Sequence, residues 1–249
     1  MKFTGSLVCG AALIFGLSSS PTKANETEGW GGEASLNGSV TTGNNDTSNL
    51  GFGLKVNNRG SEWRHSAKAS ADYGRSNGNT NKRRYRLGYK IGRDLAPRTY
   101  GFANADYYSD DFGAYKQGHF FGAGIGYSAL IDDPTHWRIE GGAGYRSQKA
   151  RLDNNNPLGI PSQDESFLSA RVFSDFEHKF NDQVTFSNDT EILYSEVDTF
   201  FINEAGLTSN IFESLAVRAT FRVETHTDVP VGREKTDTIS RVGIVYKMN

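Results

Sequence analysis

The sequence predicts an all-β fold, a transmembrane antiparallel up-and-down β-barrel of about twelve strands with both termini on the periplasmic side. Three observations predict it. Apolar and polar residues alternate with period two along most of the chain. Most alternating segments reach the length of about 9–11 residues that a tilted strand needs to cross a bilayer, whereas soluble strands usually have about 5–6. A leader typical of exported proteins precedes the first of these segments.

Residues 1–24 have the features of a secretory signal peptide. Lys2 supplies a positive start, residues 7–17 are apolar, and Thr22 and Ala24 are the small residues that a signal peptidase reads. The apolar segment is shorter than the roughly 20 residues of a membrane-spanning helix. We therefore predict a cleaved signal peptide over 1–24 and an outer-membrane β-barrel over 25–249, in a Gram-negative-type bacterium.

The amino-acid composition narrows the class of protein further. The only cysteine, Cys9, lies in the leader, so the exported chain is expected to be rigid without disulfides. The formal net charge of −2 argues against a nucleic-acid partner and against a polybasic membrane anchor. The mean hydropathy of −0.56 resembles that of a soluble protein. A barrel whose strands point every second residue into a polar interior produces a similar value.

The strands are predicted from the alternation itself. Within 82–92, for example, Tyr85, Leu87 and Tyr89 alternate with Arg86 and Lys90. The predicted spans are 30–41, 48–57, 63–74, 82–92, 99–108, 118–131, 136–148, 165–180, 183–195, 200–210, 214–226 and 237–248.

The connections between these segments supply a second clue. Those that follow odd-numbered strands are mostly long, and we count the seven-residue segment 75–81 among them. Those that follow even-numbered strands are mostly short. Outer-membrane barrels combine short periplasmic turns with longer external loops. We find no domain boundary and no repeat of fixed period.

The apolar face of the strands could point into lipid or, in an exported soluble β-sandwich, toward a second sheet. The apolar sets carry no charge in mid-strand, as lipid contact requires, because a charge there costs about 2–4 kcal/mol. Aromatic residues near strand ends are expected to form interfacial girdles. These are Trp30, Trp63, Tyr73, Tyr100, Tyr145, Phe180 and Tyr194. Together these features favour the barrel.

In a barrel the opposite, polar face of each strand lines the interior. The candidate interior charges are Arg84, Arg86, Lys90, Arg138, Glu140, Arg146, Arg171, Asp175, Asp189, Glu191, Arg218, Arg222, Glu224 and Arg241. They could form a packed salt-bridge network that plugs the barrel, or line a narrow polar channel whose charges set its selectivity. The sequence leaves both possibilities open.

Three segments resemble a known family. Residues 30–44 (WGGEASLNGSVTTGN), 100–113 (YGFANADYYSDDFG) and 230–248 (PVGREKTDTISRVGIVYKM) are similar to a bacterial family of unknown function. Some of its members are described as salt-induced outer-membrane proteins. The resemblance covers essentially the whole exported chain and implies an outer-membrane β-barrel, without a reaction, a ligand or functional residues. The chain ends in Met248-Asn249, whereas barrels of this membrane usually end in an aromatic residue that assists assembly.

One motif raises the possibility of catalysis. Ser76 opens a Ser-Asn-Gly segment that resembles the His-x-Ser-Asn-Gly of outer-membrane phospholipases, but Gly74 stands in the place of the histidine. A nucleophilic serine needs a base within hydrogen-bond reach, and Ser-Asn-Gly is also typical of turns. We therefore predict no catalytic residue.

Some residues could bind a metal ion or a phosphate, but none of them follows a specific motif. The histidines lack the spacing of a ready metal site. The acidic segments 110–111 and 153–156 could hold Ca²⁺, or bridge to lipopolysaccharide phosphates, but are more typical of solvated loops. The glycine-rich segments 122–126 and 141–145 have no following helix, so strand curvature and interior packing explain them better than phosphate binding. We predict no metal and no cofactor.

The resulting functional hypothesis is an integral outer-membrane barrel without catalysis, either a small passive channel or an envelope protein of salt or osmotic stress. An outer-membrane lipid-modifying hydrolase acting through Ser76 and a soluble exported sandwich that binds a ligand are the alternatives. The expected partners are outer-membrane lipid, lipopolysaccharide and the barrel-assembly machinery, and no nucleic acid.

Overall fold

The computed structural model describes residues 29–41, 47–112, 115–150, 164–196, 198–227 and 235–248. The predicted leader, the acidic segment 153–156 and Asn249 lie outside these residues. The strands are β1 (Gly29–Thr41), β2 (Thr47–Arg59), β3 (Trp63–Ser76), β4 (Asn79–Ala96), β5 (Thr99–Asp110), β6 (Tyr115–Leu130), β7 (Thr135–Ala150), β8 (Asp164–Lys179), β9 (Val184–Tyr194), β10 (Thr199–Asn210), β11 (Leu215–His226) and β12 (Thr236–Met248).

The twelve strands close into one antiparallel barrel, in which each pairs with its neighbours along the chain and β12 pairs with β1. The predicted fold class is confirmed. Gly32 near the start of β1 lies opposite Met248 at the end of β12, so the barrel begins and finishes at one end. That this end faces the periplasm stays a prediction. The described residues contain no helix long and apolar enough to cross a membrane.

Burial along the strands is the reverse of that in a soluble protein. On β4 the side chain of Leu87 is 55% exposed, whereas that of the adjacent Arg86 is only 8% exposed. Tyr85 and Tyr89 are exposed like Leu87, and Arg84 is buried like Arg86. The apolar residues therefore form the outer surface, where lipid replaces water, and closure leaves the charged residues inside. This arrangement contradicts the alternative of a soluble sandwich.

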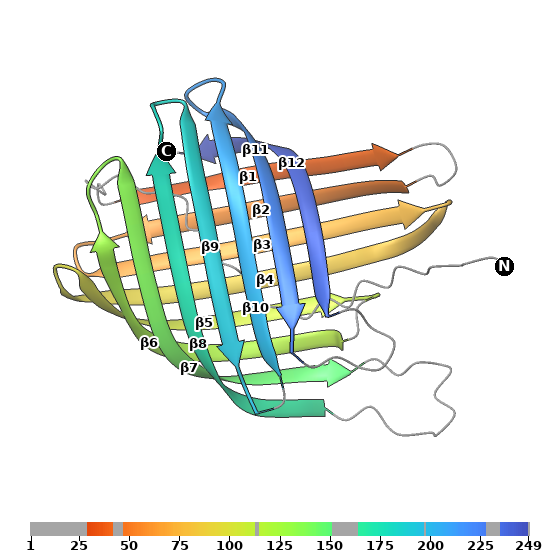
Figure 1. The fold of residues 1–249 in the computed structure, drawn as a ribbon, viewed down its shortest axis with the longest axis horizontal. Coiled ribbons are helices and arrows are strands. Elements are labelled where there is room, and N and C mark those ends of the chain that lie inside the picture. The colour runs from red at the N-terminus through yellow and green to blue at the C-terminus, as the bar shows by residue number, and fades with distance from the viewer. Residues whose placement is uncertain are drawn as a thin grey trace.

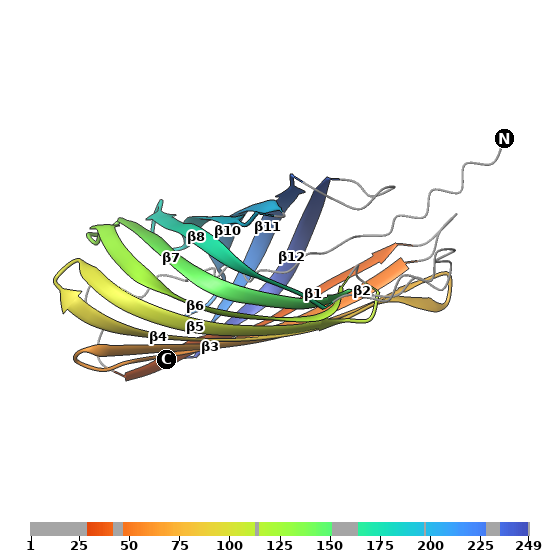
Figure 2. The ribbon, with the colours of Figure 1, turned by 90° about the horizontal axis from the view of Figure 1, so that it is seen from below.

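The barrel is flattened. In Figure 1, β8–β11 run steeply across the nearly horizontal β1–β4. Figure 2, seen from below, shows these two groups of strands as opposite walls. Interior side chains of one wall therefore face those of the other across a short distance, and this proximity brings together charges that are far apart in the sequence.

One predicted connection is wrong. The segment 75–81 was expected to be a long loop, but β3 and β4 are joined by the two-residue turn Asn77-Gly78. Both residues have positive φ values, 49° at Asn77 and 80° at Gly78. Asn-Gly is the preferred sequence for such a tight hairpin turn because these residues tolerate a left-handed backbone.

The predicted aromatic girdle is largely present on the outer surface. Of the named residues, six are exposed: Trp30, Trp63, Tyr73, Tyr145, Phe180 and Tyr194. Tyr100 is an exception, because its side chain is 4% exposed and points into the barrel. The strand alternation explains the difference: Tyr100 shares its face of β5 with Phe102 and Asn104, which are also buried.

A small polar patch interrupts the apolar outer surface between β9 and β10. The side-chain amide of Asn203 donates to Asn188 Oδ1 at 3.1 Å and to Thr190 Oγ1 at 2.8 Å, and that of Asn188 donates to Asn203 Oδ1 at 3.3 Å. These mutual hydrogen bonds reduce the cost of placing amides against lipid.

Candidate functional site

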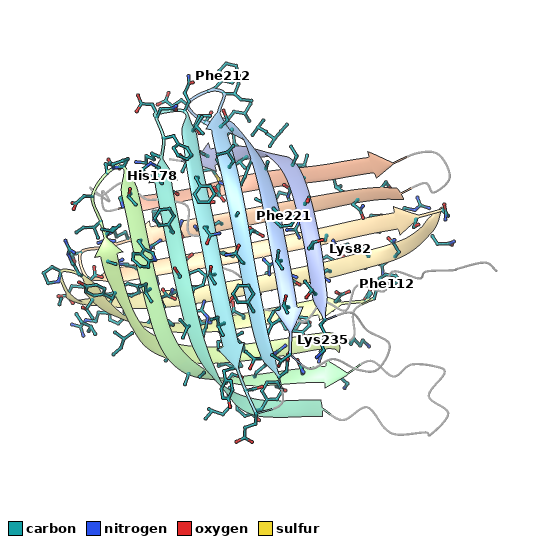
Figure 3. All side chains as sticks on the ribbon, in the orientation of Figure 1. Lys82, Phe112, His178, Phe212, Phe221 and Lys235 are labelled. Carbon is teal, nitrogen blue, oxygen red and sulfur yellow. The ribbon has the colours of Figure 1, made fainter. Side chains whose placement is uncertain are left out.

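The structure places the candidate interior charges on the inward face of their strands. Ten of them are buried: Arg84, Arg86, Glu140, Arg146, Arg171, Asp175, Asp189, Glu191, Arg222 and Glu224. The other four, Lys90, Arg138, Arg218 and Arg241, are partly buried. Figure 3 shows how densely side chains cover the strands. Most of these charges fall into three groups, the second and third of which meet at Arg222. Arg146 and Arg218 lie outside these groups, and Arg218 donates to both carboxylate oxygens of Glu33 at 2.9 and 3.0 Å.

The first group is the Glu140 cluster, formed by Lys90, Tyr100, Glu140, Arg171 and Glu191 on five different strands. Glu140 accepts hydrogen bonds from the Lys90 ammonium, from Tyr100 Oη at 2.7 Å and from Arg171 Nη1 at 3.1 Å. Arg171 also donates from Nε to Glu191 Oε1 at 2.5 Å. The side chains of Glu140, Arg171 and Glu191 are at most 4% exposed. The cluster thus ties β4 and β5 to β7, β8 and β9 through the interior.

Glycines on β6 make this connection possible. Lys90 and Tyr100 reach Glu140 only by passing over β6, whose inward face carries Gly122, Gly124 and Gly126. A Cβ atom at Gly126 would lie 2.2 Å from Cζ of Tyr100. The Tyr100 ring therefore lies directly on the bare backbone of β6, and its hydroxyl extends to β7. The glycine-rich segment acts in interior packing, as its mid-strand position indicates.

The second group is a row of carboxylates on neighbouring strands. In the cross-strand register, Arg138, Asp175, Asp189, Glu204 and Arg222 follow one another from β7 to β11. Arg138 Nη2 lies 2.7 Å from Asp175 Oδ2, and Arg222 Nη1 lies 3.5 Å from Glu204 Oε2. We call Asp175, Asp189 and Glu204 the carboxylate row. Asp189 lies between the other two carboxylates, and repulsion between like charges disfavours this arrangement.

Two lysines on the opposite wall balance this row. Lys55 and Lys68 lie directly opposite each other on β2 and β3 and form the lysine pair. Each interacts electrostatically with Asp189 across the barrel. Both carboxylate oxygens of Asp189 are buried and accept no hydrogen bond within the described part of the chain. The lysine pair thus faces the carboxylate row across the interior, and on its own wall it stands in a register row with Glu33 and Asp106.

The third group lies near the end of the barrel that carries the longest connections. We call Lys82, Arg84, Arg86, Arg222 and Arg241 the mouth cluster; these residues come from β4, β11 and β12. Arg84 Nε donates to Asp110 Oδ2 at 2.7 Å, and Arg222 Nε donates to Glu224 Oε1 at 2.6 Å. Glu204 Oε2 faces two guanidinium groups, because Arg222 lies at 3.5 Å and Arg241 at 3.8 Å from this one oxygen. The mouth cluster thus brings four guanidinium groups and one ammonium group together with Asp110, Glu204 and Glu224.

Several interior residues were not among the candidates. Lys55, Lys68 and Glu204 alternate with outward residues like the chosen ones, so the same period-two pattern could have found them. Asp110 was expected in a solvated loop that could hold Ca²⁺, but it is 2% exposed and paired with Arg84. Its neighbour Asp111 lies 3.1 Å from Arg83.

The structure also shows where the Ser-Asn-Gly motif lies. Ser76 lies opposite Asn79 in the register, at the edge of the Asn77-Gly78 turn. Its Ser-Asn-Gly segment therefore forms a tight turn, as the sequence pattern indicates. The parts of the chain that the structure describes contain no group of three or more His, Cys, Asp or Glu side chains arranged to hold a metal ion.

Solved structures with similar folds are outer-membrane barrels. The NanC porin matches with a TM-score of 0.53 and 13% identity, over 87% of this chain and 100% of the porin chain. The translocator domain of the autotransporter NalP from Neisseria meningitidis matches with a TM-score of 0.51 and 14% identity, over 89% of both chains. At these identities the similarity concerns the fold alone.

Sequence comparison identifies the family. None of the curated proteins compared matches this chain. A family model described as "Protein of unknown function, DUF481" matches residues 34–248. That range includes nearly all of the barrel, from β1 to the end of β12. The chain, whose described strands close into a twelve-stranded barrel, therefore belongs to the DUF481 family of proteins of unknown function.

Proposed function

We propose that the protein is an outer-membrane channel of small conductance, without catalysis, which passes small ions along its charged interior. The observation that carries this proposal is the environment of Asp189. Its carboxylate is buried between those of Asp175 and Glu204, and neither oxygen accepts a hydrogen bond from the described residues. A buried charge without hydrogen bonds is costly unless water or a mobile ion solvates it. A hydrated interior at this level therefore supports conduction.

The two walls around Asp189 would set the selectivity. Charged rings in narrow pores attract one sign of ion and exclude the other. Here the lysine pair and the carboxylate row oppose each other, so cations and anions each meet an attractive wall. The Glu140 cluster borders the carboxylate row along the strands, since Glu140 and Glu191 lie two residues from Arg138 and Asp189 and are thus the next inward-facing residues. Its ion pairs limit the width of the pathway.

Conductance in planar bilayers tests this function. The refolded protein is expected to give discrete, small current steps that rise with KCl concentration. In Asp189→Asn the carboxylate row loses a charge, so the cation-to-anion permeability ratio is expected to fall several-fold, whereas in Lys68→Gln it is expected to rise. Asp133→Asn, at an exposed carboxylate in the β6–β7 connection, is the matched control and should leave the ratio unchanged.

Two results would contradict the proposal. One is an electrically silent bilayer although heat-modifiable gel mobility shows that the barrel has folded and inserted. The other is a conductance whose selectivity does not respond to either interior substitution. A silent, folded barrel would favour the alternative of a structural envelope protein.

A further inference from the structure

Two carboxamides lie on the lipid-facing side of the barrel, far from the strand ends. Asn188 on β9 and Asn203 on β10 are at least four residues from either end of their strands. Both face outward, because their chain neighbours Asp189 and Ile202 are buried in the interior. By contrast, the outward amide of Asn58 on β2 lies one residue from the end of its strand. Hydrocarbon offers no hydrogen bonds, so polar groups in the middle of this surface point to a function.

The two amides satisfy each other only in part. We call Asn188, Thr190 and Asn203 the amide patch. Asn203 Nδ2 donates to Asn188 Oδ1 and to Thr190 Oγ1, which uses both of its hydrogens. Asn188 Nδ2 donates to Asn203 Oδ1, and Thr190 Oγ1 donates to Asn188 Oδ1. A carboxamide has two N–H donors and an oxygen that accepts two hydrogen bonds. Among the described residues, one N–H of Asn188 and one acceptor position of Asn203 Oδ1 are therefore unused.

The unused donor and the unused acceptor lie side by side at one depth of the membrane. Asn188 Nδ2 is 3.3 Å from Asn203 Oδ1, and both side chains are partly exposed. Small residues flank them. In the register Ala205 lies opposite Asn188, and Ser174 lies opposite Thr190. Small side chains at a membrane-embedded surface let another backbone approach closely.

The amide patch lies on a broad outer wall. The wall of β8–β11 stands in front of the other strands in Figure 1 and forms one side of the flattened barrel in Figure 2. Exposed apolar side chains surround the patch, among them Phe201, Ile192 and Phe221, the last of which is labelled in Figure 3. In the register Phe201 lies opposite Ile192, and Phe221 lies opposite Ala205. Packing and hydrogen bonds between polar side chains drive the association of transmembrane helices, and the same forces act between two barrel walls.

A patch that carries both a donor and a matching acceptor is complementary to itself. In a two-fold symmetric dimer, each surface meets the same surface of the second copy. With the symmetry axis along the membrane normal, groups at one depth face each other, so Asn188 Nδ2 of each copy can donate to Asn203 Oδ1 of the other. We propose that the amide patch is the centre of a homodimer interface in the membrane, held by these two reciprocal hydrogen bonds. The interface lies on the outer surface and does not depend on the ion pathway at Asp189.

Energy transfer between labelled copies in phosphatidylcholine vesicles tests the association. With Cys9 replaced by serine, the refolded protein is labelled at Asp133→Cys, an exposed position, with donor or acceptor fluorophores. Energy transfer is expected to follow a monomer–dimer equilibrium as the protein-to-lipid ratio rises. Asn203→Leu is expected to raise the midpoint of this curve about tenfold, because each dimer loses both reciprocal hydrogen bonds. The control is Asn58→Leu, which removes an outward amide near a strand end on the opposite wall and should leave the midpoint unchanged.

Mixing two variants separates the reciprocal hydrogen bonds from general packing. Asn188→Leu retains the acceptor of the interface, and Asn203→Leu retains the donor. Each variant alone loses both reciprocal bonds, whereas a mixed dimer of the two keeps one of them. The mixed dimer is therefore expected to form at a several-fold lower protein-to-lipid ratio than either variant alone, beyond the statistical advantage of unlike pairs.

Three results would overturn the proposal. The first is energy transfer no higher than random encounters produce at every protein-to-lipid ratio, although heat-modifiable gel mobility shows that the barrel has folded. The second is the same midpoint for Asn203→Leu and Asn58→Leu, because any dimer would then form through another surface. The third is a mixed dimer no tighter than the dimers of the separate variants, because the amides would then not pair across the interface. Leucine suits a lipid-facing position, so these variants are expected to fold.

Discussion

Replacing Arg171 with leucine is expected to destabilise the barrel by about 3–5 kcal/mol. Arg171 is 4% exposed and bridges Glu140 and Glu191. Glu191 is only 1% exposed, and among the described residues its ion pair is with Arg171, whereas its Oε2 accepts no hydrogen bond from them. Removing the guanidinium therefore leaves a buried carboxylate without compensation. Glu140 is less affected, because Lys90 and Tyr100 still donate to it.

The free energy of unfolding in urea, measured in lipid vesicles by heat-modifiable mobility, checks this value. The double variant Arg171→Leu with Glu191→Gln should recover part of the loss, because it also removes the orphaned charge. Arg93→Leu is the control, since the exposed pair of Arg93 with Glu62 is expected to contribute no more than about 1 kcal/mol. A loss in Arg171→Leu as small as that in the control would show that the Glu140 cluster does not stabilise the fold.

Replacing Gly124 with alanine is expected to prevent most of the protein from folding, or to cost about 3 kcal/mol where it folds. Gly124 on β6 lies opposite Gly142 on β7. A Cβ atom at Gly124 would be 2.2 Å from the carbonyl oxygen of Gly141 and 2.7 Å from Cα of Gly142. Both neighbours are backbone atoms, so no side-chain rotation relieves the overlap.

The adjacent Gly141 provides a matched control. It faces outward, and a Cβ atom there meets nothing within 4 Å. Gly141→Ala should therefore leave the yield of folded, heat-modifiable barrel unchanged. Equal yields from Gly124→Ala and Gly141→Ala would contradict the close approach of β6 and β7.

The alternation along the chain predicts the strands and their two faces, because a period of two shows directly which residues share a face. Leu87 and Arg86, which are adjacent on β4, illustrate this. The apolar side chain of Leu87 is mostly exposed, and the charged side chain of Arg86 is buried. Strand length, the predicted leader and the uncharged apolar sets then favour a barrel over a sandwich. Alternation does not predict which interior charges meet. Lys90 and Glu140 are fifty positions apart, and their contact depends on the flattening of the barrel and on the glycines of β6.

Two other errors have local causes. Tyr100 was assigned to the outer girdle because it lies near a strand end, whereas the alternation of β5 turns it inward, toward Glu140. The turn at Asn77-Gly78 was expected to be a longer loop because the flanking residues 75, 76, 79 and 81 are themselves polar. In a barrel, polar residues continue into the strands, so polarity alone does not mark where a strand ends. The alternation also does not predict that β1 and β12 pair over only six positions, because no single-strand pattern encodes where pairing stops.

The central claim is that the charged face of each strand forms the interior and the apolar face meets lipid. Fluorescence scanning of β4 tests it most directly. Single cysteines at positions 84 to 90, in a chain with Cys9 replaced by serine, are labelled with an environment-sensitive fluorophore and reconstituted in vesicles, after each variant is shown to be heat-modifiable. Labels at 85, 87 and 89 are expected to be bright and quenched by lipids with brominated acyl chains, and labels at 84, 86 and 90 are not. Quenching without alternation, or with the opposite phase, would contradict the account.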